Sequence, residues 1–211
     1  MSTLKFLLGY YNYIQHMKNK IVAIEALTLD GVMQAPGRPD EDTRDGFEYG
    51  GWAKTGDDPE MRNVIGKYMT AGWSLLVGRI TYEDLYESWK VRHPSDPMAQ
   101  ALSNVQKFVV CHDPDYHLPW EHSTLLAGDA VNMIARLKKE HNKTLIIFGS
   151  GVLVRSLMQY ELIDEYVLQI HPLVLGKGYG LFKGAGQASR LRLTDTVTTS
   201  TGVIIATYQV P

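Results

Sequence analysis

The feature that most constrains the fold is a series of short, almost continuously apolar segments that alternate with helical patterns. These segments are rich in β-branched and other large apolar residues, as β-strands are. A strand whose apolar residues do not alternate with polar ones is covered on both faces, which is typical of a parallel sheet flanked by helices. The expected strands lie at residues 20–31, 73–78, 107–111, 144–148 and 165–176.

The segments between the strands carry helix signals. Asp58 and Pro59 form an N-cap followed by a first-turn proline, and apolar residues then recur at helical spacing. Further helices are expected over residues 81–89, around Val131, Ile134 and Leu137, and over residues 152–160, whereas 37–52 is a long loop and 191–210 alternates like a hairpin. The predicted fold class is α/β, with a mainly parallel mixed sheet, helices on both faces and an antiparallel C-terminal hairpin.

Length and composition favour one domain. With 211 residues, of which 45% are hydrophobic, the chain can bury one sizeable core, so we expect a single domain over residues 17–211. Residues 1–16 precede Met17 and are expected either to be an N-terminal extension from an upstream start or to form a short helix packed on the surface or on a partner chain. They resemble neither a signal peptide nor a membrane span.

Charge and cysteine content exclude several classes of function. A formal net charge of -2 gives no basic excess for nucleic acid or an anionic membrane, so we expect neither as a partner. The single cysteine, Cys111, excludes an intrachain disulfide or a Cys-rich zinc site and favours a cytoplasmic location. His112, His117 and His122 recur at a spacing that fits neither a helix nor a strand, so we expect no metal site.

Two strand ends have the composition of an anion site. In open α/β sheets, ligands bind beyond the carboxyl ends of the strands. Residues 78–81 read GRIT and residues 149–151 read GSG, and each motif opens a helix. Small residues there let a ligand approach the backbone, and a helix N-terminus attracts phosphate. Taken singly, each motif is better explained without a ligand, 78–81 as a capped turn and 149–151 as helix–strand packing. Together they can hold the two phosphates of one dinucleotide.

The ordered segments of this chain resemble the dihydrofolate-reductase-like superfamily, and more closely the group related to the reductase domain of riboflavin biosynthesis. The resembling segments are LTLDG (27–31), DGFEYGGW (45–52), LLVGRITYE (75–83), FGSGVLVRSLMQYELIDEY (148–166) and HPLVLGKGYGLF (171–182). The resemblance implies a three-layer fold of that type, NADPH as cofactor, a small-molecule substrate and a homodimer.

The resemblance also implies which residues bind the cofactor. They are Ala26 and Met33 beside the nicotinamide; Gly78, Arg79 and Thr81 on the adenosine side; Phe148, Gly149, Ser150, Gly151, Val152 and Leu153 at the pyrophosphate; and Cys111 and His112 after the middle strand. Relatives commonly place Ser or Thr with a basic residue after that strand to hold the ribose 2′-phosphate. Here His112 is the one nearby cation and Asp113 follows it, so NADH is not excluded.

Other residues are candidates for the substrate end of the site. Asp30 either orients substrate and supplies a proton, as a catalytic residue, or serves only as a turn residue. Glu25 is a second polar candidate if it faces inward from the first strand. Phe47, Tyr49 and Trp52 either form an aromatic wall over a planar substrate or pack the long loop.

The implied function is an NADPH-dependent reductase that transfers hydride to a small planar substrate with a carbonyl or imine bond. It would be similar to 5-amino-6-(5-phosphoribosylamino)uracil reductase or to dihydrofolate reductase. Folate reduction itself is not supported, because the helix after the long loop carries Glu60 in its first turn and no later carboxylate. A hydrolase is not expected, because the glycines that a nucleophile elbow needs around Ser150 are replaced by Phe148 and Val152. The alternative is a non-catalytic dinucleotide-binding or scaffold protein of the same fold.

Overall fold

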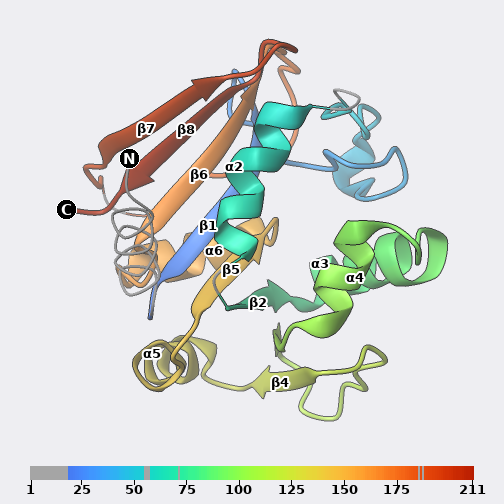
Figure 1. Cartoon of the computed structure of the whole chain (residues 1–211), viewed down its shortest axis with the longest axis vertical. Helices are drawn as coiled ribbons and strands as arrows, with labels where there is room; N and C mark the ends of the chain where they lie inside the picture. Colours follow the sequence, from blue (N-terminus) through green and yellow to red (C-terminus); the bar gives the residue numbers. More distant parts are fainter. Residues whose placement is uncertain (1–18, 55–57, 71, 185, 187) are drawn as a thin grey trace, which may run out of the picture.

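A single mixed sheet organises the protein (Figure 1). The computed structural model describes residues 19–54, 58–70, 72–184, 186 and 188–211. The strands are β1 (Ile21–Thr28), β2 (Trp73–Gly78), β3 (Lys107–Cys111), β4 (Ser123–Ala127), β5 (Thr144–Phe148), β6 (Glu165–His171), β7 (Arg192–Thr198) and β8 (Ile204–Gln209). They form an 8-stranded sheet in the order β4-β3-β2-β5-β1-β6-β8-β7. The neighbours from β4 to β6 are parallel, and β8 and β7 add an antiparallel hairpin.

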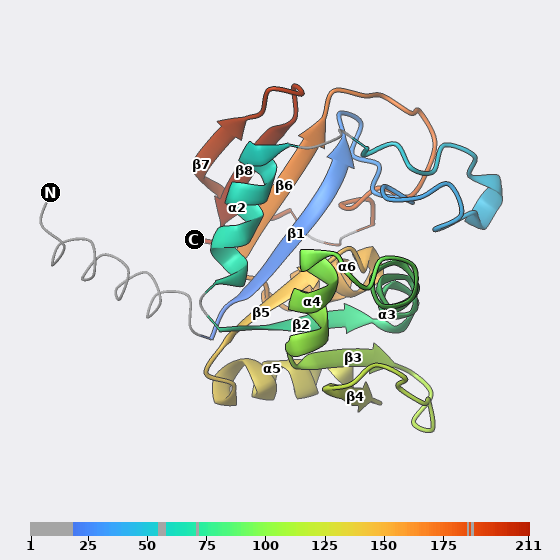
Figure 2. The ribbon, with the colours of Figure 1, turned by 45° about the vertical axis from the view of Figure 1, so that its right-hand side comes forward.

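Helices cover both faces of this sheet (Figure 1, Figure 2). They are the short 3-10 helix η1 (Arg44–Gly46), α2 (Pro59–Met69), α3 (Arg79–Leu85), the π-helical segment η2 (Tyr86–Arg92), α4 (Pro97–Asn104), α5 (Ala130–Glu140) and α6 (Gly151–Gln159). One buried cluster joins the sheet to α2, α3 and α4 through Tyr68, Tyr82 and Leu102. A second joins the opposite face to α5 and α6 through Ile134 and Val154. The predicted α/β fold class is therefore confirmed.

The central strand, β1, extends further at its carboxyl end than one of its two neighbours, β5. Residues 21–24 of β1 pair with β5, and this pairing ends with Ile24 opposite Phe148. On its other side, β1 stays paired with β6 as far as Thr28 opposite His171. Because β5 ends early, the carboxyl-end half of β1 has an open edge on the side facing β2. This opening is where a ligand can enter between the strands.

The predicted elements match the observed ones with a few corrections. The missed helix α4 is capped by Asp96 ahead of Pro97, the same signal that marks α2. Strand β4 was also missed, because its five residues, STLLA, form a short edge strand with little burial. Helix α3 begins at Arg79 with Gly78 as its N-cap, so Thr81 lies inside the first turn and does not cap the helix. The expected strand over 165–176 ends at His171, because Pro172 has no N–H to continue the pairing.

The structure leaves two predictions untested. The extension over residues 1–16 lies outside the described residues, and the boundary of a single domain over 17–211 stays a prediction. Among the helices of the described segments, none is both long and apolar enough to cross a membrane.

The cap of α2 yields a test of the fold. Asp58 is 3% exposed, accepts from the Met61 N–H at 2.9 Å and accepts from the Thr201 hydroxyl at 2.7 Å, so it ties α2 to the C-terminal hairpin. We expect Asp58→Ala to lower the free energy of unfolding by about 1–2 kcal/mol. The control is Asp96→Ala, which removes an exposed cap of α4 and is expected to cost about 0.5–1 kcal/mol. Urea denaturation of both variants measures this, and an equal loss would contradict the tie between α2 and the hairpin.

Candidate functional site

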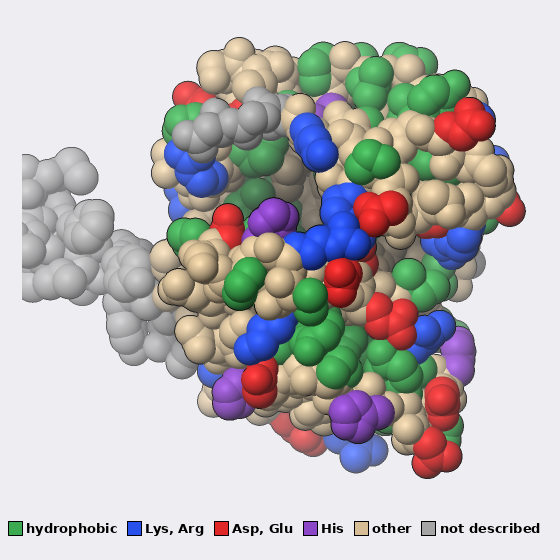
Figure 3. Space-filling view, turned by 90° about the vertical axis from the view of Figure 1, so that its right-hand side faces the viewer, with side chains coloured by type: hydrophobic (Ala, Val, Ile, Leu, Met, Phe, Trp, Pro, Cys, Tyr) green, Lys and Arg blue, Asp and Glu red, His purple; other side chains and the backbone are tan. Residues whose placement is uncertain are grey.

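A large cavity lies at the carboxyl ends of β1, β2, β3 and β5, with a volume of about 1190 Å³. Figure 3 looks onto the side that carries α3, α4 and the loop 37–52, and it shows a hollow bordered by Lys and Arg side chains. Pockets for one drug-sized ligand span roughly 300–1,000 Å³. The cavity therefore has room for a dinucleotide and a small second molecule.

The two strand-end motifs meet at the edge of this cavity. The Gly78 N–H donates to the Ser150 hydroxyl oxygen at 3.0 Å, which joins the turn after β2 to the turn after β5. A Cβ on Gly149 would lie 3.3 Å from the Thr81 methyl group, so the glycine lets these turns approach. Ser150 has a left-handed backbone with φ of 58°, a conformation that costs a non-glycine residue about 1–2 kcal/mol. The hydrogen bond to Gly78 compensates for part of this strain.

Every residue that the resemblance implies for cofactor binding lines this one cavity. They are Ala26, Met33, Gly78, Arg79, Thr81, Cys111, His112, Phe148, Gly149, Ser150, Gly151, Val152 and Leu153. Their gathering is a result of topology, because the parallel strands β1, β2, β3 and β5 all end at the same edge of the sheet. Their role in binding a cofactor stays a prediction.

Arg79 is available to an anion at the cavity wall. Its guanidinium donates to the Glu83 carboxylate at 2.8 Å and lies over the Tyr116 ring, with its side chain 43% exposed. The hydrogen bond and charge of Glu83 raise the pKa of Arg79 above its ordinary value, so it stays a cation. An ion pair this exposed is weak and exchanges readily for a better acceptor such as a phosphate.

Glu25 is the most unusual ionisable group in the cavity wall. It is 1% exposed, and its Oε1 atom is buried with no hydrogen-bond partner in the described structure. Burial raises the pKa of Glu25 well above its ordinary value, because desolvation penalises the carboxylate. Alternation along β1 places Glu25 with Ala23 and Leu27 on the face covered by α6, whereas Ala26 shares the opposite face with Ile24.

Asp30 does not line the cavity. Its exposed carboxylate accepts from the Thr28 hydroxyl at 2.5 Å and from the backbone N–H groups of Leu175 and Gly176 at 3.2 and 2.7 Å. These hydrogen bonds, that of Thr28 first, lower the pKa of Asp30 below its ordinary value. The geometry therefore favours the turn interpretation over a catalytic role, since a strongly held carboxylate is a poor proton donor.

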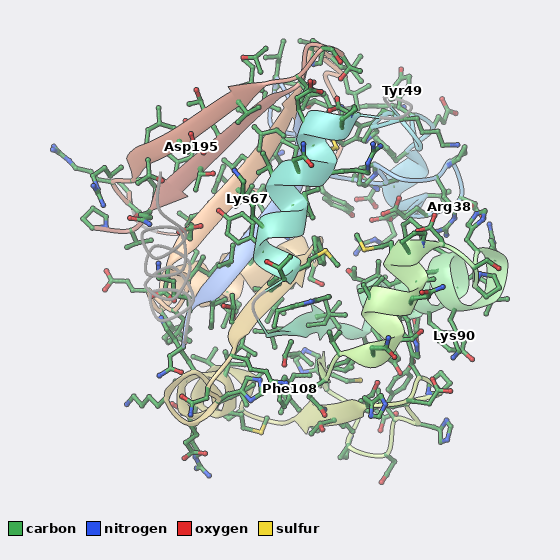
Figure 4. All side chains as sticks on the ribbon, viewed as in Figure 1. Arg38, Tyr49, Lys67, Lys90, Phe108 and Asp195 are labelled. Atoms are coloured by element: carbon green, nitrogen blue, oxygen red, sulfur yellow. The ribbon has the colours of Figure 1, made fainter. Side chains whose placement is uncertain are left out.

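The loop aromatics pack against the loop itself. Phe47 is buried with Val32 and Ala35, and the Trp52 indole N–H donates to the Gln34 carbonyl at 2.7 Å. Tyr49 is 46% exposed at the outer end of the loop (Figure 4). Because Phe47, Tyr49 and Trp52 do not line the cavity, their arrangement favours loop packing over an aromatic wall for substrate.

Sequence reasoning missed the contacts that close the other side of the cavity. Arg38, in the loop, forms an ion pair with Asp84 of α3 at 2.5 Å and donates to the Ser88 hydroxyl of η2. Figure 4 shows Arg38 beside these helical segments. Arg38, Asp84, Ser88 and Gln169 all line the cavity. Arg38 and Asp84 are 46 residues apart, and no spacing rule links them.

Comparison with known proteins identifies the family. The family model described as the RibD C-terminal domain matches residues 19–205. The chain belongs to the RibD C-terminal domain family. The Bacillus subtilis (strain 168) protein named "Uncharacterized protein YwjB" is 31% identical over 180 residues, which cover 85% of this chain and 92% of that protein. A second protein of that strain, YyaP, is 36% identical over 75 residues, 36% of this chain and 40% of that protein.

Solved structures share the fold. A Shewanella sp. PV-4 protein whose name links it to riboflavin biosynthesis has a TM-score of 0.68 at 21% identity, over 91% of this chain and 99% of that one. Dihydrofolate reductase from Enterococcus faecalis, complexed with NADP(H), has a TM-score of 0.59 at 17% identity, over 91% and 96% of the two chains. The deaminase/reductase from Thermotoga maritima has a TM-score of 0.62 at 12% identity, over 96% of this chain and 59% of that one. The predicted dihydrofolate-reductase-like fold is thus confirmed.

The buried state of Glu25 gives a pH-dependent prediction. Above pH 4.5, the ordinary pKa of a glutamate side chain, the unfolded chain releases the Glu25 proton while the folded chain keeps it, so stability falls as the pH rises. Glu25→Gln removes this loss. We expect the variant to become progressively more stable relative to the unaltered protein as the pH rises above 4.5, measured by urea denaturation at each pH.

Asp30→Asn is the matched control for this titration. Because the pKa of Asp30 is lowered in the folded protein, its contribution is present above the ordinary aspartate pKa and is lost only as the pH falls through the folded value. Its stability difference from the unaltered protein should therefore be constant over the range in which the Glu25→Gln difference grows. A constant difference for Glu25→Gln as well would show that Glu25 is ionised in the folded protein.

Proposed function

We propose that this protein is a reductase that uses NADPH to reduce a small planar substrate with a carbonyl or imine bond. The observation that carries the proposal is the cavity: one continuous wall contains every residue implied for a dinucleotide. Membership of the RibD C-terminal domain family and the fold shared with a reductase complexed with NADP(H) support it. A homodimer and a cytoplasmic location remain parts of the proposal.

The residues present fit a dinucleotide. The N-terminus of α6 follows Ser150, and its first helical hydrogen bond runs from the Val154 N–H to the Ser150 carbonyl. The N–H groups of the first turn therefore have no partner within the helix and can bind the pyrophosphate. Arg79 and Thr81, at the start of α3, would bind the second anionic group. Gly151 lets the flexible Met33 side chain lie against the first turn of α6, because a Cβ on residue 151 would collide with it.

The nicotinamide would lie between Ala26 and Met33, where β1 extends past β5. When bound, the reduced nicotinamide supplies a hydride for the substrate carbon. The heteroatom of the substrate also needs a proton. Asp30 does not line the cavity and Glu25 is 1% exposed, so we infer that the proton comes from water entering through the open mouth.

The substrate would lie on the Ala26 side of the sheet. Ala26 is paired with Gln169, whose amide offers a donor and an acceptor to a planar ring. Trp89, from η2, contributes an aromatic side chain to the same cavity. These groups suit a flat heterocycle better than an aliphatic substrate. We propose a reaction like that of a pyrimidine or pterin reductase, with the substrate itself unassigned.

One observation favours a second candidate function. The acidic residue expected beside the nicotinamide, Asp30, is committed to the turn at Leu175 and Gly176. A fold that keeps dinucleotide affinity without turnover would need no acid there. The second candidate is therefore a non-catalytic dinucleotide-binding or scaffold protein, and it predicts cofactor binding without oxidation by any substrate.

Titration with NADPH and with NADH, followed by nicotinamide fluorescence, tests the cofactor. We expect saturable NADPH binding that Arg79→Ala weakens about tenfold, since a hydrogen bond to a charged group contributes about 1.5–3 kcal/mol. Arg92→Ala is the control, because Arg92 is an exposed arginine that does not line the cavity, and it should bind as the unaltered protein does. Equal affinity for NADH would mean that no residue selects the 2′-phosphate. Failure to bind either dinucleotide would refute the reductase proposal.

A further inference from the structure

Glu25 is the first residue of β1 beyond the reach of β5. The pairing of β1 with β5 ends at Ile24 opposite Phe148, and the chain then turns away through Gly149 and Ser150. On its other side Glu25 stays paired with Leu168 of β6. The side of Glu25 that faces away from β6 therefore borders the opening in the sheet, and the residue is part of the cavity wall.

The Glu25 carboxyl lacks a complete set of partners in the described part of the chain. The residue is 1% exposed, and its Oε1 atom has no hydrogen bond. Buried polar atoms in proteins are nearly always hydrogen-bonded, because an unpaired one loses the free energy of its hydration. An apolar residue such as leucine would fill this position without that loss. The carboxyl therefore indicates a ligand that completes its hydrogen bonds.

Burial decides between two roles for the Glu25 carboxyl, that of a proton donor and that of a fixed hydrogen-bonding group. A proton donor must regain its proton from water after each reaction, and with 1% of its surface exposed Glu25 is poorly placed to do so. A fixed hydrogen-bonding role needs no such route. Burial also raises the pKa of Glu25 well above its ordinary value, which favours the neutral carboxylic acid, with one O–H donor and one carbonyl acceptor. That pair is complementary to a primary carboxamide, which offers an acceptor and a donor side by side.

We propose that the Glu25 carboxyl binds the carboxamide of the nicotinamide cofactor, donating its O–H to the carboxamide oxygen and accepting one carboxamide N–H. This inference rests on the proposed function, because it requires the nicotinamide ring at this end of the cavity. Glu25 faces the α6 layer, whereas Ala26 faces the opposite layer. Holding the carboxamide on the α6 side leaves the rest of the ring directed toward the Ala26 side, where the substrate would bind.

The test compares three ligands with three proteins at one pH, using calorimetry. The ligands are NADPH, its 3-acetylpyridine analogue, in which a methyl group replaces the carboxamide NH2, and 2′-phospho-ADP-ribose, which lacks the nicotinamide. The proteins are the unaltered chain, Glu25→Gln and Glu25→Leu. Gln keeps one donor and one acceptor, whereas Leu keeps neither and suits the buried position, so both variants are expected to fold. Thermal unfolding verifies this.

We expect Glu25→Leu to bind NADPH about tenfold more weakly, as the loss of two neutral hydrogen bonds predicts, and to bind 2′-phospho-ADP-ribose unchanged. Glu25→Gln should bind NADPH within about threefold of the unaltered protein. The unaltered protein should prefer NADPH over the acetylpyridine analogue, and Glu25→Leu should lose that preference.

Each other outcome is decisive. If Glu25→Leu binds NADPH normally, or keeps the preference over the analogue, the proposed pairing is wrong while the cofactor proposal stands. If it weakens 2′-phospho-ADP-ribose equally, Glu25 only maintains the fold, which also overturns the pairing. If the unaltered protein binds 2′-phospho-ADP-ribose but not NADPH, there is no nicotinamide pocket. If it binds none of the ligands, the proposed function has failed as well.

Discussion

The site depends on the unequal lengths of two neighbouring strands. β1 is paired on both sides up to Ile24, and beyond that residue it is paired only with β6. Where β5 ends, the backbone edge of β1 and the turn after Phe148 face the same space, and the cavity forms there. The turn is held by the hydrogen bond from the Gly78 N–H to the Ser150 hydroxyl, which fixes Ser150 in a left-handed conformation. This hydrogen bond extends the contact between β2 and β5 beyond the residues that pair in the sheet.

Two carboxyl groups near the end of β1 show how the surroundings of a carboxyl group determine which protonation state is favoured. Asp30 is exposed and receives hydrogen bonds from a hydroxyl and from two backbone N–H groups, so it is held as an anion. Glu25 lies five residues earlier along the chain, is buried and lacks a partner at Oε1, so its neutral form is favoured. Proximity in sequence gives no guide to this difference. The anion closes a turn, and the buried acid lines the cavity.

The loop over residues 37–52 belongs to the site through its backbone and its charges rather than its aromatic rings. Phe47 and Trp52 pack inward to fix its shape, as the Trp52 hydrogen bond to Gln34 shows. Arg38 then joins the loop to α3 through Asp84, across the cavity that both segments line. Family membership and the shared fold support a reductase-type function without naming a substrate.

The sequence by itself determined most of the strands, their mainly parallel arrangement and the candidates for an anion site. Apolar runs such as 144–148 form strands wherever they are covered on both faces, and Gly-rich strand ends lie at one edge of a parallel sheet, so local patterns were enough for these, whereas the full set of cofactor-binding candidates came from the family resemblance. Tertiary structure alone decided which acids face the cavity, because the same residue type is an anion or a neutral acid according to its neighbours. It also decided that Phe47 and Trp52 pack the loop, that Tyr49 lies exposed and that Arg38 reaches Asp84, since contacts between distant segments leave no periodic signal in the chain.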